Sequence, residues 1–124
     1  MVLAHPGLHV STAEAYRAMP SSPRPVVLTQ LSHLDRLIRS LERGRPVEEW
    51  EGLLFNRMES ARLPVLAEVE KARKVLLQLG LRGARMSGSG SSVFGFAGSH
   101  AEAEVAARRL KGYPWRVFVT CCNG

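Results

Sequence analysis

The sequence predicts an α+β fold, a two-layer sandwich in which helices cover one face of a four-stranded antiparallel sheet. Four short runs have the β-branched and aromatic character of strands, at residues 2–5, 84–87, 92–97 and 115–122. Helical patterns separate the first run from the second and the third from the fourth. This order is that of a split βαβ arrangement, with extra helices inserted after the first strand.

The length is that of one domain, spanning residues 1–124. The chain is 45% hydrophobic, enough for one core and too little for two. No apolar run approaches the roughly 20 residues of a membrane helix, and the N-terminus lacks a signal-peptide pattern, so we expect a cytoplasmic protein with no membrane partner. The two cysteines, Cys121 and Cys122, are adjacent and build no disulfide framework; on a strand they would point to opposite faces.

The net charge of +6 comes mainly from arginine, which supplies 14 of the 17 basic residues. Guanidinium groups suit phosphate or carboxylate, so an anionic ligand is favoured. The arginines are spread along helical faces, however, and the strands lack the paired aromatic residues with basic neighbours that bind RNA. We therefore expect no nucleic-acid partner, and an arginine-rich composition accounts for the charge.

The N-terminal third begins with the strand at residues 2–5, directly after Met1, which we read as a cut end of a longer protein. Ser11 and Glu14 have the spacing of a capping box, so a helix starts near Thr12. It ends before Pro20, and the turn-rich connection over residues 21–25 stops any helix.

Three amphipathic helices follow. The first has an apolar stripe that ends at Gly44, the second runs over residues 47–58, and the third runs over 65–79 and stops at Gly80. The stripe of the first helix comprises Leu28, Leu31, Leu34, Leu37, Ile38 and Leu41. We assign these helices to scaffold and core.

The C-terminal third is predicted to hold a hairpin, a helix and a last strand. The runs at 84–87 and 92–97 flank a glycine-serine loop. Ser99 and Glu102 repeat the capping-box spacing and open a helix over residues 101–110, before the strand at 115–122.

The glycine-serine loop, Ser87, Gly88, Ser89 and Gly90, is the first candidate site. Successive N–H groups in a glycine-rich turn can converge on an anion, and glycine lets a phosphate or another backbone come close. The loop is not a P-loop, because it lacks the GK[ST] sequence and precedes a strand; it is not a dinucleotide fingerprint either. A tight hairpin turn explains it equally well.

The start of the first helix is the second candidate. Thr12 lies in the first turn beside free N–H groups, and Tyr16 is one turn later on the same side. Together they could grip a ligand with a phosphate and a base, although a capping threonine and a half-buried tyrosine are commonplace. His5 and His9 bracket this turn and could touch the same ligand.

Catalytic and metal-binding groups are not found by pattern. Phosphoryl transfer needs a carboxylate base, a metal ligand and usually a lysine near the phosphates. The single aspartate, Asp35, lies in the middle of an amphipathic helix and is interpreted as a solvated charge. The four histidines have no metal-ligand spacing, so we expect no metal site and no catalytic residue in this chain.

Three segments together resemble a known family: VSTAEAYRAM at 10–19, LFNRMESARLPVLAEVEKARKVL at 54–76, and ARMSGSGSSVFGF at 84–96. They resemble the C-terminal half of enzymes in the GHMP kinase superfamily. The glycine loop is shared across that superfamily, whereas the first two segments resemble its branch that phosphorylates a cytidine-diphosphate sugar alcohol in the non-mevalonate route to isoprenoids. The resemblance spans nearly the whole chain and implies a ferredoxin-like domain.

The resemblance also implies roles. Thr12 matches a threonine near the reacting end of the substrate, Tyr16 matches the aromatic residue that stacks on cytosine, and Ser87 to Gly90 match a loop that shapes the active-site cleft. The ATP loop, the catalytic aspartate and the lysine belong to an N-terminal ATP-binding domain with no counterpart here. ATP and Mg²⁺ would serve the full-length enzyme, and this chain alone would bind the cytidine end weakly and transfer nothing.

Three other interpretations remain open. A stand-alone regulatory module could use the same sandwich to bind a small anion. Another GHMP kinase, for homoserine or mevalonate, would share the glycine loop. A basic nucleic-acid-binding domain ranks last. If a partner domain is missing, exposed apolar surface could also drive self-association.

Overall fold

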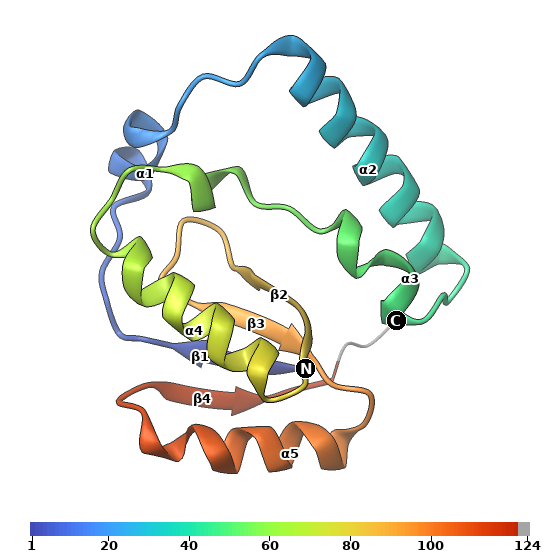
Figure 1. The fold of residues 1–124 in the computed structure, drawn as a ribbon, viewed down its shortest axis with the longest axis vertical. Helices are drawn as coiled ribbons and strands as arrows, with labels where there is room; N and C mark the ends of the chain where they lie inside the picture. The colour runs from blue at the N-terminus through green and yellow to red at the C-terminus, as the bar shows by residue number, and fades with distance from the viewer. Residues whose placement is uncertain (122–124) are drawn as a thin grey trace.

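The predicted two-layer α+β fold is confirmed in the computed structural model, which describes residues 1–121 (Figure 1). Its strands and helices are β1 Val2–His5, α1 Thr12–Ala18, α2 Arg24–Glu42, α3 Val47–Trp50, α4 Leu66–Gln78, β2 Arg82–Met86, β3 Val93–Phe96, α5 His100–Arg109 and β4 Arg116–Val119. Short 3-10 turns lie at η1 Glu51–Leu53, η2 Arg57–Ser60 and η3 Leu110–Gly112.

The sheet is antiparallel throughout and has the strand order β2-β3-β1-β4. The first and last strands therefore lie next to each other, with Leu3 of β1 opposite Phe118 of β4 and, on its other side, Phe94 of β3. The backbone N-terminus donates to the Thr120 carbonyl at 2.9 Å and extends this pairing beyond the strands.

One face of the sheet is covered by α4, packed on β2 and β3, and by α5, packed on β4 and β1 (Figure 1). The two central strands, β1 and β3, alternate buried and half-buried residues, which is the pattern of a sheet with one covered face. The core between the layers is formed by Val2, Ala4, Val69, Ala72, Leu76, Leu81, Ala84, Met86, Val93, Ala103, Ala106, Leu110 and Trp115. Deletion of methylene groups here would carry the large cost of a core cavity.

The other face is covered only at one edge. Trp50, at the end of α3, packs edge-on against Phe96 with 5.1 Å between ring centroids, and its indole N–H donates to the Arg45 carbonyl at 2.9 Å. Trp50 is thus buried on the side of β3 away from the core, while Phe118 stays 53% exposed at the far side of the sheet. α2 rests on α3 and η1 rather than on the sheet.

Most predicted boundaries are confirmed. Both predicted serine caps are formed, since Ser11 Oγ accepts from the Glu14 N–H at 3.3 Å and Ser99 Oγ accepts from the Glu102 N–H at 3.1 Å, while the Glu102 carboxylate accepts from the Gly98 N–H rather than from that of Ser99. The predicted strand over 115–122 is shorter in the structure and ends at Val119. Cys121 follows it and is exposed, and the predicted opposite orientation of Cys122 lies outside the described residues.

One predicted element is wrong. The helix expected over residues 47–58 is broken into α3 and the two turns η1 and η2, with extended backbone at Leu54 and Asn56 between them. The apolar residues whose spacing indicated one helix lie instead in or beside these three short segments. The break follows Gly52, a weak helix former, and it frees the Asn56 side chain for bonds to the glycine loop.

Candidate functional site

The glycine-serine loop closes the hairpin between β2 and β3 through two backbone bonds. The Ser87 N–H donates to the Ser92 carbonyl at 2.8 Å, and the Gly90 N–H donates to the Ser87 carbonyl at 3.0 Å. Gly88 and Gly90 adopt positive φ angles of 57° and 94°, a region where side chains with a Cβ are strained. A Cβ on Gly90 would also lie 2.8 Å from the Met86 sulfur. The glycines therefore fix the shape of this turn.

The start of the loop is held by the segment that contains η2. The Asn56 Nδ2 donates to the carbonyls of Met86 and Gly88, at 2.9 and 2.7 Å. The Met86 N–H donates to Glu59 Oε1 at 2.8 Å. Both polar groups of the Met86 backbone are thus bound by side chains three residues apart. These bonds define the path by which the chain enters the loop.

The first helix also contacts the loop. Thr12 Oγ1 lies 3.0 Å from Ser89 Oγ, so the predicted site residues at the helix start and in the loop are brought together. The Ser91 hydroxyl is buried and donates to the Leu8 carbonyl at 2.8 Å. α1 is therefore fixed to the loop at both its first turn and its approach.

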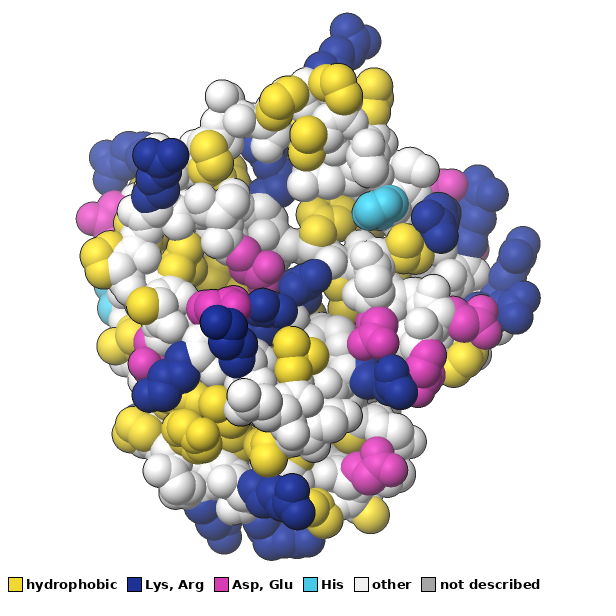
Figure 2. Space-filling view, viewed as in Figure 1, with side chains coloured by type: hydrophobic (Ala, Val, Ile, Leu, Met, Phe, Trp, Pro, Cys, Tyr) yellow, Lys and Arg dark blue, Asp and Glu magenta, His cyan; other side chains and the backbone are white. Residues whose placement is uncertain are grey.

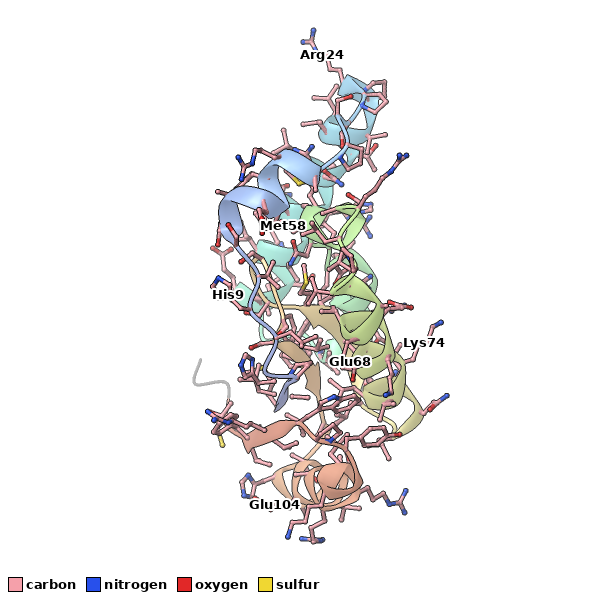
Figure 3. All side chains as sticks on the ribbon, turned by 90° about the vertical axis from the view of Figure 1, so that its left-hand side faces the viewer. His9, Arg24, Met58, Glu68, Lys74 and Glu104 are labelled. Carbon is pink, nitrogen blue, oxygen red and sulfur yellow. The ribbon has the colours of Figure 1, made fainter. Side chains whose placement is uncertain are left out.

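A hollow of about 380 Å³ opens between α1 and η2, beside the loop. It is lined by Tyr16, Met19, Phe55, Asn56, Arg57, Met58 and Gly88. This side faces the viewer in Figure 3, where Met58 is labelled. Tyr16 and Phe55 are 60% and 40% exposed, which leaves aromatic surface in contact with solvent. The Arg57 guanidinium donates to Ser22 Oγ at 3.2 Å, and this bond holds the Arg57 side chain at the edge of the hollow.

The histidines are placed differently from one another. His5 Nδ1 lies 2.9 Å from Ser92 Oγ at the end of the hairpin loop, while His9 is exposed. No three His, Cys, Asp or Glu side chains within residues 1–121 gather into a metal-ligand group. Asp35 forms an exposed ion pair with Arg39 at 2.8 Å on α2, which agrees with its interpretation as a solvated charge.

Among residues 1–121, the clear pKa shifts are those of Glu70 and Arg73, which lie on α4 and outside the hollow. Two hydrogen bonds from the Arg73 guanidinium, of 2.7 and 2.8 Å, lower the pKa of the Glu70 carboxyl below its ordinary value. The same hydrogen bonds raise the pKa of Arg73. This pair stabilises α4 and is not part of the candidate site. None of the helices in residues 1–121 is long and apolar enough to cross a membrane.

Sequence reasoning placed Thr12, Tyr16 and the loop at this site but gave no role to Phe55, Asn56, Arg57 or Glu59. The missing signal was the break in the helix pattern after Gly52.

The family profile described as GHMP kinases, C terminal, matches residues 11–114. The 4-diphosphocytidyl-2-C-methyl-D-erythritol kinase of Desulfitobacterium hafniense is 37% identical over 123 residues, which are 97% of this chain and 40% of that protein. The enzyme of the same name from Citrifermentans bemidjiense is 36% identical, over 88% of this chain and 37% of its own. The chain thus spans about two fifths of these relatives.

Solved structures agree on the fold. A crystal structure of 4-(cytidine 5′-diphospho)-2C-methyl-D-erythritol kinase superposes with a TM-score of 0.68 and 31% identity, over 94% of this chain and 40% of that one. Homoserine kinase from Cytophaga hutchinsonii gives a TM-score of 0.61 over 94% of this chain and 39% of its own, and at 24% identity it shows the fold alone. The profile match and these relatives show that the chain belongs to the GHMP kinase family, as a C-terminal domain of that family.

Proposed function

We propose that this chain forms the substrate-side domain of an ATP-dependent kinase that phosphorylates the 2-hydroxyl of 4-(cytidine 5′-diphospho)-2-C-methyl-D-erythritol, in non-mevalonate isoprenoid synthesis. The observation that carries the proposal is the hollow beside the glycine loop, with the exposed rings of Tyr16 and Phe55 on its lining. The names of the relatives support the choice of substrate.

The cytosine ring stacks on Tyr16 in this proposal, because base-on-aromatic stacking contributes about 1–3 kcal/mol and needs no charge. Phe55 belongs to the same lining and supplies further apolar contact. Arg57 stands at the rim, where a guanidinium can donate two parallel bonds to a phosphate. The hollow thus offers one surface for the base and one cation for the diphosphate.

Thr12 lies toward the reacting end of the substrate in this proposal. Its hydroxyl is held 3.0 Å from Ser89 Oγ, which ties its position to the glycine loop. The loop in turn presents backbone at Gly88, where a Cβ would point into open space. A second domain can therefore approach the loop closely, and the cleft between the two domains is where the phosphoryl group would move.

ATP and Mg²⁺ are held, in this proposal, by the ATP-binding domain that the resemblance places ahead of this one, together with the catalytic aspartate and lysine. That domain is the expected partner, and the chain alone is expected to transfer no phosphate. Bound ATP supplies the phosphoryl group, while the residues described here orient the acceptor hydroxyl.

The test is a titration of the 124-residue chain with cytidine 5′-diphosphate, followed by ¹⁵N–¹H NMR, with adenosine 5′-diphosphate as the comparison nucleotide. We expect weak binding that favours cytidine and shifts the amide signals of Tyr16, Phe55 and Gly88. The Tyr16→Ala variant should bind at least about fivefold more weakly, from the loss of one stacking contact. Phe118→Ala is the matched control, because it removes an equally exposed ring on β4, at the far side of the sheet.

Other outcomes point elsewhere. Equal binding of both nucleotides, or unchanged binding by Tyr16→Ala, would rule out this base site. Tight binding of inorganic phosphate alone would instead favour a stand-alone anion-binding module. Phosphate transfer from ATP by the isolated chain would contradict the assignment of the catalytic groups to another domain.

A further inference from the structure

α2 exposes apolar side chains along its whole length. None of its 19 residues is buried, although it is strongly amphipathic. Half of the large hydrophobic residues found exposed in the described chain lie on it: Val26 44%, Leu28 55%, Leu31 56%, Leu34 43%, Ile38 47% and Leu41 53%. Figure 1 shows α2 standing away from the sheet, and hydrophobic side chains gather at the top of the view in Figure 2, where α2 begins. Contiguous apolar surface of this kind marks an interaction site.

The spacing of these residues is that of a helix-pairing surface. Val27, Leu31, Leu34, Ile38 and Leu41 follow each other at intervals of four, three, four and three residues, which is a heptad repeat. We call this row the α2 seam. α3 and η1 contact the neighbouring side of the helix, through residues such as Leu37 that are half-buried. Val27 is half-buried too, whereas Leu31, Leu34, Ile38 and Leu41 are exposed and remain available to another helix.

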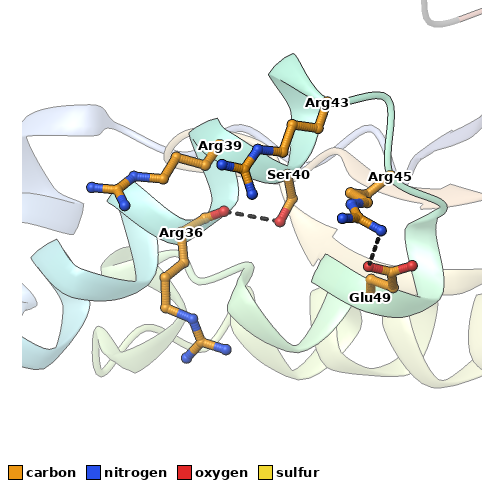
Figure 4. Close-up of a pocket in the computed structure, with 6 residues that line it drawn as sticks. All are labelled: Arg36, Arg39, Ser40, Arg43, Arg45 and Glu49. Carbon is orange, nitrogen blue, oxygen red and sulfur yellow. Dashed lines mark hydrogen bonds and ion pairs between the residues drawn. The ribbon is translucent and has the colours of Figure 1, made fainter.

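The charges beside the seam distinguish between possible occupants. At 100° per residue, Arg24, Asp35 and Glu42 border its open side. Arg36, Arg39 and Arg43 lie on the opposite side, where with Ser40, Arg45 and Glu49 they line a separate hollow of about 290 Å³ (Figure 4). An anionic membrane pressed on the seam would meet two carboxylates at its border. A helix with the same border charges in reverse order would place an arginine beside Glu42 and a carboxylate beside Arg24.

That condition is met by a second copy of this chain, and we propose that the α2 seam is an interface between two copies packed antiparallel. A two-fold axis between Ser32 and His33 places Leu31 of one copy beside Leu34 of the other, and Val27 beside Ile38. The same axis brings Arg24 of each copy beside Glu42 of the other. The apolar row and the pair of Arg24 with Glu42 are therefore self-complementary, as an isologous interface requires, whereas Asp35 of each copy lies on the same border as Asp35 of the other.

The interface is small. α2 is about 28 Å long at 1.5 Å per residue, and one helix pair buries less surface than a standard stable interface. We therefore expect a weak dimer that dissociates on dilution. This proposal does not rest on the proposed kinase function, since the seam and the hollow beside the glycine loop share no residue.

The first experiment is sedimentation velocity of the 124-residue chain over a wide range of concentration, with the variant Leu31→Asp. A concentration-dependent dimer is expected, and Leu31→Asp should raise its dissociation constant at least about tenfold by placing a charge in the seam. Thr29→Asp is the matched control, because it adds the same charge on the far side of α2 and should leave the dimer intact. Circular dichroism shows whether each variant is folded.

A charge exchange keeps the test decisive if Leu31→Asp fails to fold. Arg24→Glu alone and Glu42→Arg alone should each weaken the dimer. The double variant R24E/E42R should restore it, because the pair of opposite charges forms again with the two charges exchanged. A monomer at every concentration overturns the proposal, as does a dimer that neither change weakens. Flotation of a monomeric chain with phosphatidylglycerol vesicles would also overturn it and assign the seam to a membrane surface.

Discussion

Asn56 and Met86 are 30 residues apart, yet the Asn56 side-chain amide donates to the Met86 carbonyl at 2.9 Å. The same amide reaches the Gly88 carbonyl at 2.7 Å, and its oxygen accepts from the Met58 N–H at 3.0 Å. One side chain therefore joins the turn at η2 to the entry of the glycine loop. The shape of the loop depends on a segment that precedes it by a whole helix and a strand.

Replacement of Asn56 by Ala should destabilise the chain by about 1–3 kcal/mol, because the partly buried Met86 carbonyl and the exposed Gly88 carbonyl both lose their donor. Urea unfolding measures this, and hydrogen exchange of the Gly90 amide reports the loop itself. Thr29→Ala, on the exposed side of α2, is the control and should change stability little. If Asn56→Ala matches the control in both measurements, the bonds do not hold the loop.

Gly88 and Gly90 should respond differently to the same substitution. Both have positive φ, so alanine at either position costs about 1 kcal/mol or more in backbone strain. At Gly88 the new Cβ meets open space, whereas at Gly90 it lies 2.8 Å from the Met86 sulfur. Thermal unfolding should therefore rank the wild type above Gly88→Ala, and Gly88→Ala above Gly90→Ala. Equal losses would mean that the Met86 side chain moves aside.

The hydroxyl contact between Thr12 and Ser89 can be tested by a pair of substitutions. Thr12→Val removes the hydroxyl and keeps the shape, while Thr12→Ser keeps the hydroxyl. Because the contact is exposed, Thr12→Val should cost only about 0.5–1 kcal/mol of global stability. It should nevertheless speed hydrogen exchange at Gly90, whose amide donates to the Ser87 carbonyl, and Thr12→Ser should not. Equal rates of amide hydrogen exchange in the two variants would mean that the hydroxyl contact does not constrain the loop.

The ion pair of Glu70 and Arg73 predicts a defined pH dependence. The hydrogen bond from Arg73 lowers the pKa of Glu70 below its ordinary value of 4.5. A lowered folded pKa adds stability above the ordinary value, and that stability is lost as the pH falls through the folded value. The effect is small, because the Glu70 side chain is 44% exposed.

An NMR titration of the Glu70 carboxyl checks this directly. Arg73→Gln should raise its pKa toward the ordinary value. Lys74→Gln should raise it less, because Lys74 contributes after Arg73 and at 3.7 Å. A larger change from Lys74→Gln than from Arg73→Gln would contradict the assigned cause.

Local signals in the sequence predicted most of the fold. The serine caps at Ser11 and Ser99 are formed within four residues, so they could be recognised without knowledge of the rest of the chain. The helix expected over 47–58 was wrong for the opposite reason. Its break is stabilised by the bonds of Asn56 to a loop 30 residues later and by Trp50 packing on Phe96, and neither contact has a local signal.

The candidate site divides in the same way. Thr12, Tyr16 and the glycine loop were named from spacing and family resemblance, and the structure places Thr12 against the loop and Tyr16 on the adjacent hollow. Their roles toward a substrate stay predictions. Phe55 and Arg57 could not be found, because their place in the lining follows from the packing of η2 against α1.

The adjacency of β1 and β4 has a mechanical consequence. Val2 is paired with Val119 and His5 with Arg116. The start of β1 and the end of β4 therefore lie side by side, at the same end of the sheet. A pull applied at Met1 and Thr120 would load these rungs one after another, starting with Val2, rather than all together. The hydrogen-bonded pairs of β1 and β4 would then break one at a time, which needs little force. The pairs of β3 with β1 and β2 would bear load only after β4 had separated.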